Sequence, residues 1–195
     1  MATQPSRTFM TYQEFEELDR FGKITELLDG EFFVVSPIFR HQEIVGSLYL
    51  AFRSYLAEHP LGKVLVAPFD IVLSKEQRRG RVIQPDIMYF STPTLARLEY
   101  RGARLLGMPD LAVEVLSGDG RYDRGKKLEF YGEYRIPELW HVTPERPRIE
   151  IYRTGPDGTF ARSADLGAED WLTTPLLPGF QQPVGPLYED LEPEA

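Results

Sequence analysis

The pattern of apolar and polar residues divides the chain into short segments with different periods. Segment 11–21 places its apolar residues on one helical face, and Thr11 and Glu14 have the spacing of a capping box. Two short apolar runs follow, joined at Asp29-Gly30, a dipeptide that is typical of a tight hairpin turn. The beginning of the chain therefore predicts a helix followed by a β-hairpin.

The central part of the chain contains the longest helical pattern. From 40 to 58, apolar residues recur at spacings of three and four, as on the buried face of a helix. These residues include Ile44, Leu48, Phe52 and Tyr55. A second helix is predicted from about 122 to 134, and a short one near 95–100.

Apolar runs bounded by turn residues predict strands. Segment 111–117 is almost continuously apolar, as in a strand that is covered on both faces. Segment 148–154 alternates and is followed by a Gly-Pro-Asp-Gly hairpin turn. The other strand-like segments are 63–74, 82–91 and 138–144. Together the elements predict a mixed α/β or α+β fold, with one sheet and helices on its faces.

The length of 195 residues fits one domain over 1–195, with a helical segment at 1–22 and an acidic Pro/Gly-rich tail at 170–195. A hydrophobic content of 42% with 27% charged residues is sufficient for a buried core. No apolar stretch approaches the roughly 20 residues that span a bilayer, and no secretory signal pattern is present. The absence of cysteine excludes disulfides and thiolate metal sites. We therefore expect a cytoplasmic protein.

The formal net charge of −8, from 30 acidic and 22 basic residues, counts against a nucleic-acid partner. Phosphate contacts normally come from a basic surface. The bases are nevertheless concentrated in segments 75–81 and 121–127. A solvated loop or helix end explains these two segments as well as a binding surface does.

Two acidic residues interrupt apolar strands. Glu114 lies within LAVEVL, and Asp86 follows Pro85 within VIQPDIMYF. A buried ionised carboxylate is costly unless it is paired, hydrogen-bonded or bound to a metal. If the two strands are neighbours, the side chains can converge, and such a pair suits Mg²⁺ or Mn²⁺. Each acid alone is more often structural, but the pair favours a site.

Lys127 is the candidate for the third site residue. It lies about one turn into the second predicted helix, where it can point back toward the end of the strand that contains Glu114. An ammonium there could orient the attacking water or stabilise charge in a phosphoryl-transfer transition state. The alternative is an ion pair within the helix with Asp123, four residues earlier. Lys126 points about 100° away around the helix, and the choice between the two lysines stays open.

The segments that contain these residues resemble a known family. QPDI with Asp86 and VEVLS with Glu114 resemble the PD-(D/E)XK nuclease superfamily. More closely, the chain resembles the Uma-type putative restriction endonuclease family, long described as a domain of unknown function. The matching blocks cover most of the chain and occur in the family's order: TELLDGEFFVVSP, RHQEIVGSL, QPDIMYF, MPDLAVEVLS and RYDRGKKLEFYGEYRIPELWHVTP. The resemblance implies a restriction-endonuclease-like core, a central sheet flanked by helices, preceded by the N-terminal helix and hairpin.

The chain departs from the simple superfamily pattern after Glu114. Leu116 stands where a lysine is expected, and the family resemblance implies that Lys127 supplies this ammonium from the following helix. Glu26 in TELLDGE and His41 in RHQE also match family positions. The resemblance implies that Glu26 adds an acidic contact to the metal site and that His41 touches phosphate or water. For His41, a satisfied histidine at a helix start is the stronger interpretation.

These observations lead to the hypothesis of a Mg²⁺- or Mn²⁺-dependent endonuclease that hydrolyses DNA phosphodiester bonds. Asp86 and Glu114 would hold the metal, together with the carbonyl of Val115, and Lys127 would assist the water. The rivals are an inactive interaction or regulatory domain on a nuclease fold, and a metal phosphohydrolase that acts on a small molecule. A homodimer is possible, since endonucleases often act as dimers to cut two strands, but the sequence fixes no interface. No dinucleotide cofactor is expected, because the turn at 118–120 carries an acid where a pyrophosphate would bind.

Overall fold

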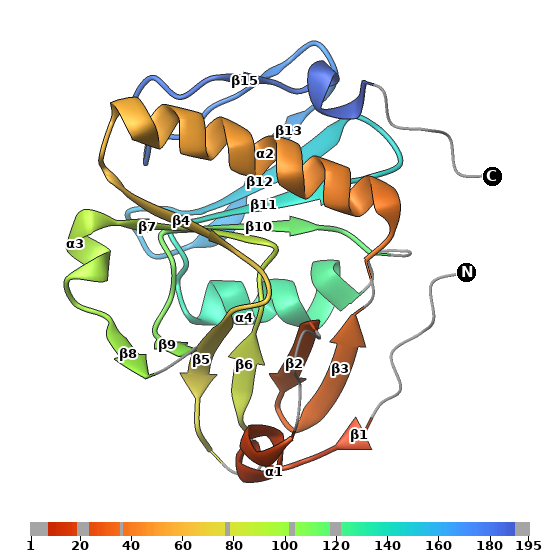
Figure 1. Ribbon diagram of the computed structural model, residues 1–195, viewed down its shortest axis with the longest axis vertical. Helices are drawn as coiled ribbons and strands as arrows, with labels where there is room; N and C mark the ends of the chain where they lie inside the picture. Colours follow the sequence, from red (N-terminus) through yellow and green to blue (C-terminus); the bar gives the residue numbers. More distant parts are fainter. Residues whose placement is uncertain are drawn as a thin grey trace.

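The computed structural model describes residues 8–18, 24–35, 37–76, 79–101, 104–117 and 122–189. Two large sheets and one small sheet carry most of the fold (Figure 1). The helical elements are α1 (Tyr12–Glu17), α2 (Phe39–Glu58), α3 (Thr92–Leu95), the π-helical turn η1 (Asp123–Lys127), α4 (Leu128–Glu133) and the 3-10 turn η2 (Gly185–Tyr188). Among the helices of the described residues, none combines the length and the apolar character of a membrane-spanning segment.

The first large sheet has seven strands in the order β1-β3-β2-β6-β5-β9-β8. They are β1 (Thr8–Phe9), β2 (Ile24–Leu28), β3 (Glu31–Val35), β5 (Asp70–Ser74), β6 (Arg81–Ile83), β8 (Glu99–Arg101) and β9 (Arg104–Leu106). All its pairs are antiparallel except β5 with β9.

The second large sheet has six strands in the order β13-β12-β11-β10-β7-β4. They are β4 (Gly62–Val66), β7 (Ile87–Ser91), β10 (Leu111–Val115), β11 (Glu138–Thr143), β12 (Arg148–Thr154) and β13 (Phe160–Leu166). Only β10 and β11 run parallel. The chain then forms a small antiparallel pair of β14 (Trp171–Leu172) and β15 (Gln182–Pro183).

The helices cover the six-stranded sheet on both faces. Figure 1 shows α2 along one face and α4 between the two large sheets. The apolar side of α2, which includes Leu48 and Phe52, packs with Val113 and Trp140 in one core cluster. On the opposite face, one cluster joins residues of α4 to both sheets: Leu28, Ile83, Met88, Ala112, Phe130, Tyr131 and Leu139. The side chains of β10 are therefore covered on both faces, as its nearly continuous apolar run predicts.

The local turn and cap predictions for the N-terminal part are confirmed. Thr11 caps α1 and forms a capping box with Glu14. Asp29 and Gly30 have φ values of 51° and 83°, the two positive angles of a tight hairpin turn between β2 and β3. The predicted helix 11–21 ends earlier, at Glu17, and residues 19–21 lie outside the described residues.

Two of the predicted strands are each divided between the sheets, so the single sheet of our prediction is wrong. Segment 63–74 forms β4 in the six-stranded sheet and β5 in the seven-stranded sheet. Segment 82–91 forms β6 and β7, which likewise belong to different sheets. Pro68 and Pro85 lie in the two breaks, where a residue without an N–H cannot extend a ladder. The mixed fold class itself is confirmed.

Three further segments differ in detail from the predictions. The short helix expected near 95–100 lies earlier, as α3, and β8 occupies the end of that segment. The helix expected from 122 to 134 begins as a π-helical turn with a break at Gly125 and continues as α4. The expected tail packs onto the core over 172–187, with Leu172, Leu177, Phe180, Val184 and Leu187 buried; residues 190–195 lie outside the described residues.

Candidate active site

The division of segment 82–91 places Asp86 beside Glu114. β7 pairs with β10 so that Ile87 lies opposite Val113, and Asp86 therefore comes next to Glu114 at the end of the ladder. The backbone N–H of Val115 donates to Asp86 Oδ2 at 2.8 Å. Both acids are buried, with 8% and 3% of their surface exposed. The predicted convergence of the two acidic residues is present.

Lys127 meets the acid pair from η1. Its Nζ lies 2.8 Å from Glu114 Oε1 and 2.8 Å from Glu26 Oε1. Tyr131, one turn further along, donates its hydroxyl to the same Oε1 of Glu114. Lys126 instead faces the hairpin, where its Nζ lies 3.3 Å from the carbonyl of Leu28. The structure thus places Lys127, and not Lys126, at the site.

Glu26 comes to the site from β2 in the other large sheet. It is 1% exposed and accepts a hydrogen bond of 2.9 Å from the backbone N–H of Gln84. The hydroxyl of Tyr122 lies 3.5 Å from its second oxygen. The side chain of Gln84 continues the network, donating to Asp70 at 2.6 Å. The segment between β6 and β7 therefore links the two sheets at the candidate site.

His41 approaches Asp86 from the first turn of α2. Its Nε2 lies 3.2 Å from Asp86 Oδ2, and its side chain is 4% exposed. Nδ1 is buried without a hydrogen-bond partner in the described part of the chain. His41 is therefore not the fully satisfied helix-start histidine that we favoured, because one ring nitrogen is unpaired and the other contacts a candidate metal ligand.

The site carries more negative than positive charge. Burial raises the pKa of Glu114 well above its usual range; Lys127 lowers it, while Asp86 and Glu26 raise it further. Burial and the same two acids also raise the pKa of Asp123, to about 6, against the lowering effect of Lys127. Burial lowers the pKa of Lys127, but Glu114 and Glu26 outweigh burial and raise it well above its usual range. Four buried carboxylates and one ammonium thus share the site.

These residues enclose a cavity of about 30 Å³, lined by Glu26, His41, Gln84, Asp86, Glu114, Val115, Ser117, Tyr122, Asp123 and Lys127. This volume is sufficient for a water-sized occupant. The predicted turn at 118–120, which follows Ser117, lies outside the described residues.

The donor set fits a hard divalent cation with few protein ligands. Among the described residues, no group of three or more His, Cys, Asp or Glu side chains is placed to hold a metal ion. Asp86 and Glu114 each use one oxygen in the contacts above, and within the described chain their other oxygens, Oδ1 and Oε2, accept no hydrogen bond. Mg²⁺ is commonly held by one or two carboxylates and retains several waters. Val115 lines the cavity, so its carbonyl stays a predicted ligand.

Several polar residues at the site were not predicted from the sequence. Tyr131 lies in the predicted helix 122–134 and is buried, and its hydroxyl donates to Glu114. His141 lies beside Glu114 in the register of β10 and β11, inside the apolar run ELWHVT. Burial, with Lys127 and Arg124 nearby, lowers the pKa of His141 to about 3. A polar residue within an apolar run was the available signal for His141, as it was for Glu114.

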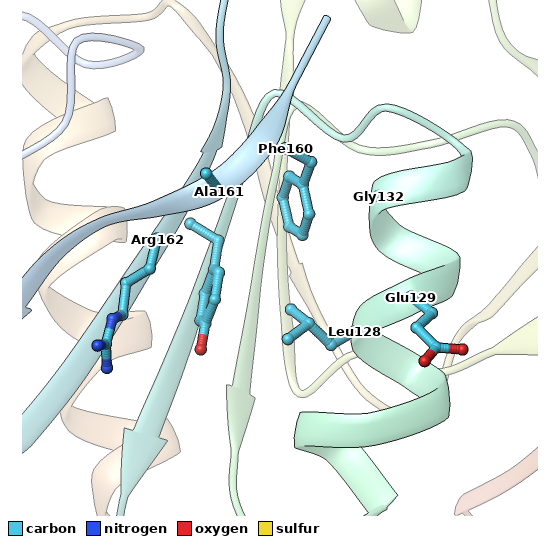
Figure 2. Close-up of a pocket in the computed structure, with 7 residues that line it drawn as sticks. Leu128, Glu129, Gly132, Phe160, Ala161 and Arg162 are labelled. Carbon is cyan, nitrogen blue, oxygen red and sulfur yellow. The ribbon is translucent and has the colours of Figure 1, made fainter.

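A larger cavity of about 480 Å³ lies between α4 and β13 (Figure 2). It is lined by Leu128, Glu129, Gly132, Tyr152, Phe160, Ala161 and Arg162. Figure 2 shows Phe160 and Leu128 facing the space between strand and helix. This cavity contains none of the convergent acids, so the smaller cavity is the candidate active site.

Comparisons with known proteins support a nuclease-like fold. A sequence model of the Uma2 family, described as putative restriction endonucleases, matches residues 12–185. The crystal structure of a putative nuclease from Anabaena variabilis superposes with a TM-score of 0.73 and 16% identity, and the match covers 92% of this chain and 97% of that one. That protein belongs to a family of unknown function. No curated protein matches the sequence.

Proposed function

Because the chain belongs to the Uma2 family of putative restriction endonucleases, we propose that it is a metal-dependent nuclease that hydrolyses DNA phosphodiester bonds. The observation that carries this proposal is the meeting of Asp86, Glu114 and Lys127 in one buried cavity. Two acids from neighbouring strands and an ammonium from the next helix can support a metal-assisted phosphoryl hydrolysis, because they supply metal ligands and a group that stabilises negative charge.

The acid pair would hold a Mg²⁺ or Mn²⁺ ion through its spare oxygens. A bound divalent cation supplies Lewis acidity to the phosphoryl oxygen and makes a water more acidic at neutral pH. The four carboxylates of the site favour such an ion, because a cation offsets their mutual repulsion.

Lys127 would bind the reacting groups directly. Its ammonium can donate to the attacking water or to a non-bridging phosphate oxygen, where negative charge increases in the transition state. Glu26 and Glu114 hold this ammonium in place from both sides, each at 2.8 Å. Tyr131 orients Glu114 by its hydrogen bond. His41 would orient Asp86 through its Nε2, which lies 3.2 Å from Asp86 Oδ2.

Cleavage assays with single substitutions test this proposal. Asp86→Asn and Glu114→Gln should reduce Mg²⁺- or Mn²⁺-dependent cleavage of plasmid and linear duplex DNA to the level measured with a chelator. Glu43→Gln is the control, because Glu43 is an exposed carboxylate on α2 that does not line the cavity. Circular dichroism would verify that each variant folds.

The outcomes separate the proposal from its rivals. Cleavage retained by both acid variants would overturn the assigned mechanism. A wild-type protein that neither binds Mn²⁺ in calorimetry nor cuts DNA would indicate an inactive nuclease-fold domain. Cleavage of small phosphodiesters without cleavage of DNA would retain the chemistry and overturn the DNA substrate.

A further inference from the structure

A second charged cluster, which the proposed chemistry does not use, surrounds Glu150 on β12. Glu150 is 4% exposed and accepts hydrogen bonds from three guanidinium groups. Arg124 Nε lies 3.0 Å from its Oε2, while Arg148 Nη2 and Arg162 Nη1 lie 3.3 and 2.9 Å from its Oε1. These four residues, together with Asp165, are called the arginine cluster below.

The arginine cluster lies on the same row of the six-stranded sheet as the active site. Across β10, β11, β12 and β13, the register aligns Glu114, His141, Glu150 and Asp165 in turn. In-register residues point to the same face, and neighbouring strands lie about 4.8 Å apart. Glu150 is therefore about 10 Å from Glu114, two strand spacings away. Arg124 belongs to η1, the turn that carries Lys127, so one short element contributes a residue to the arginine cluster and a residue to the active site.

The three guanidinium groups are more exposed to solvent than the carboxylate that they bind. The side chain of Glu150 is 6% exposed, whereas those of Arg124, Arg148 and Arg162 are 33%, 30% and 49% exposed. Figure 2 shows the Arg162 side chain extending away from Phe160 and from α4. In the described part of the chain its hydrogen bonds use Nη1 alone, which leaves Nε and Nη2 as available donors.

The arginine cluster is locally positive in an acidic chain. Asp165 pairs with Arg148 at 2.9 and 2.7 Å, so three guanidinium groups face two carboxylates. The chain as a whole carries a net charge of −8. A planar guanidinium with free N–H groups matches phosphate oxygens in geometry and charge. Glu150 holds the guanidinium groups in position before binding, which reduces the entropy that a ligand must overcome.

We propose that Arg124, Arg148 and Arg162 bind a phosphate of the substrate strand that neighbours the phosphate being cleaved. This inference rests on the nuclease function proposed above. The substrate strand would cross the sheet from β10 toward β13, with its scissile phosphate at Lys127. Sequence-independent contacts of this kind fix the position of the substrate without reading its bases.

The contact between these arginines and the neighbouring phosphate is called the anchor. DNA-binding titrations at several salt concentrations test it. Fluorescence anisotropy would be measured with labelled duplex and single-stranded DNA in a chelator, where metal-dependent cleavage is suppressed. Arg162→Gln leaves Glu150 two arginine partners and should weaken binding several-fold at low salt. It should also reduce the slope of log K against log salt by about 0.9 for duplex or 0.7 for single strands.

Arg153→Gln is the matched control. Arg153 lies on β12, the strand that carries Glu150, is 32% exposed, and pairs with the buried carboxylate of Glu138. It lies outside the arginine cluster, so its substitution should leave both affinity and salt slope unchanged. In cleavage assays, Arg162→Gln should raise KM and leave kcat close to that of the wild type.

The outcomes distinguish this proposal from the nuclease function. Cleavage of DNA with an unchanged salt slope in Arg162→Gln would overturn the anchor and retain the nuclease. A slope reduced in Arg162→Gln but not in Arg153→Gln, in a protein that cuts nothing, would support the anchor and overturn the nuclease. Equal slope losses in both variants, or no DNA binding by the wild type at the lowest salt, would overturn the anchor.

Discussion

Lys127 is the single residue on which the charge balance of the candidate site depends most. Its Nζ lies between Glu26 and Glu114, which come from different sheets, and its side chain is 5% exposed. Without this ammonium, the described residues that line the cavity would include four acids and no lysine or arginine. The same side chain that we assign to catalysis is therefore also expected to hold the two sheets together.

Lys127→Met should lower the free energy of unfolding by about 3–5 kcal/mol near neutral pH, the usual cost of breaking a buried ion pair. The loss should be smaller at about pH 5.5 than at about pH 8. A carboxyl whose folded pKa is raised, as for Glu114, contributes stability at low pH that is lost as pH rises. Lys127 lowers the pKa of Glu114, so its removal raises that pKa further. The stability that is lost as pH rises is therefore larger in the variant than in the wild type.

Urea unfolding of wild type and variant at the two pH values would measure this difference. Lys63→Met is the control, since Lys63 is an exposed lysine on β4 and should change stability by less than about 0.5 kcal/mol. A loss for Lys127→Met that is the same at both pH values would contradict the charge argument.

At the residue scale, the sequence was informative where a polar residue contradicted its surroundings. Asp86 and Glu114 each interrupt an apolar run of the sequence, and this pattern predicted that the two side chains converge. Gln84 gives no such signal, because its roles depend on Glu26 and Asp70, which reach it only through the folded chain. Tyr131 gives no signal either, because one hydroxyl on a buried helix face does not alter the apolar pattern.

At the element scale, the positions of the acids depend on how β7 is paired. β7 lies between β4 and β10, and Asp86 lies immediately before its first residue. The sequence predicted strands in these segments but not their division between two sheets. A hydrophobic pattern reports which residues are buried and does not report which sheet buries them.

Gly62 on β4 tests the pairing on the outer side of β7. A Cβ at this position would lie 2.1 Å from the carbonyl oxygen of Phe90 on β7. Gly62→Ala should therefore separate the two strands at this end and destabilise the protein by about 3 kcal/mol. Thermal and urea unfolding would measure the loss.

Gly46→Ala provides the contrast, because Gly46 lies in α2 and an added methyl group would meet nothing within 4 Å. This variant should gain roughly 0.5–1 kcal/mol, since alanine favours a helix more than glycine does. Equal effects for the two variants would show that the close approach of β4 to β7 does not limit stability.

At the scale of the whole molecule, the C-terminal segment completes the core that supports the site. α2 carries His41 and packs on the sheet that carries Glu114, and residues 172–187 close the other side of that cluster. Composition alone predicted an acidic tail at 170–195, because proline and glycine are frequent there. The separate leucines and the phenylalanine of this segment have no helical or strand period, so their burial could not be predicted from a pattern.

Substitution of Phe180 tests whether residues 172–187 stabilise the core. Its ring stacks on Phe52 of α2 at 5.1 Å, lies 6.4 Å from Trp140 of β11, and is 3% exposed. Phe180→Ala should cost about 3–5 kcal/mol, the value for a large aromatic removed from a core. Trp171→Ala, at a ring that is 57% exposed in the same segment, should cost less than about 0.5 kcal/mol. If the Phe180 variant is as stable as the Trp171 variant, this segment is only an appendage, and α2 must hold His41 beside Asp86 without its support.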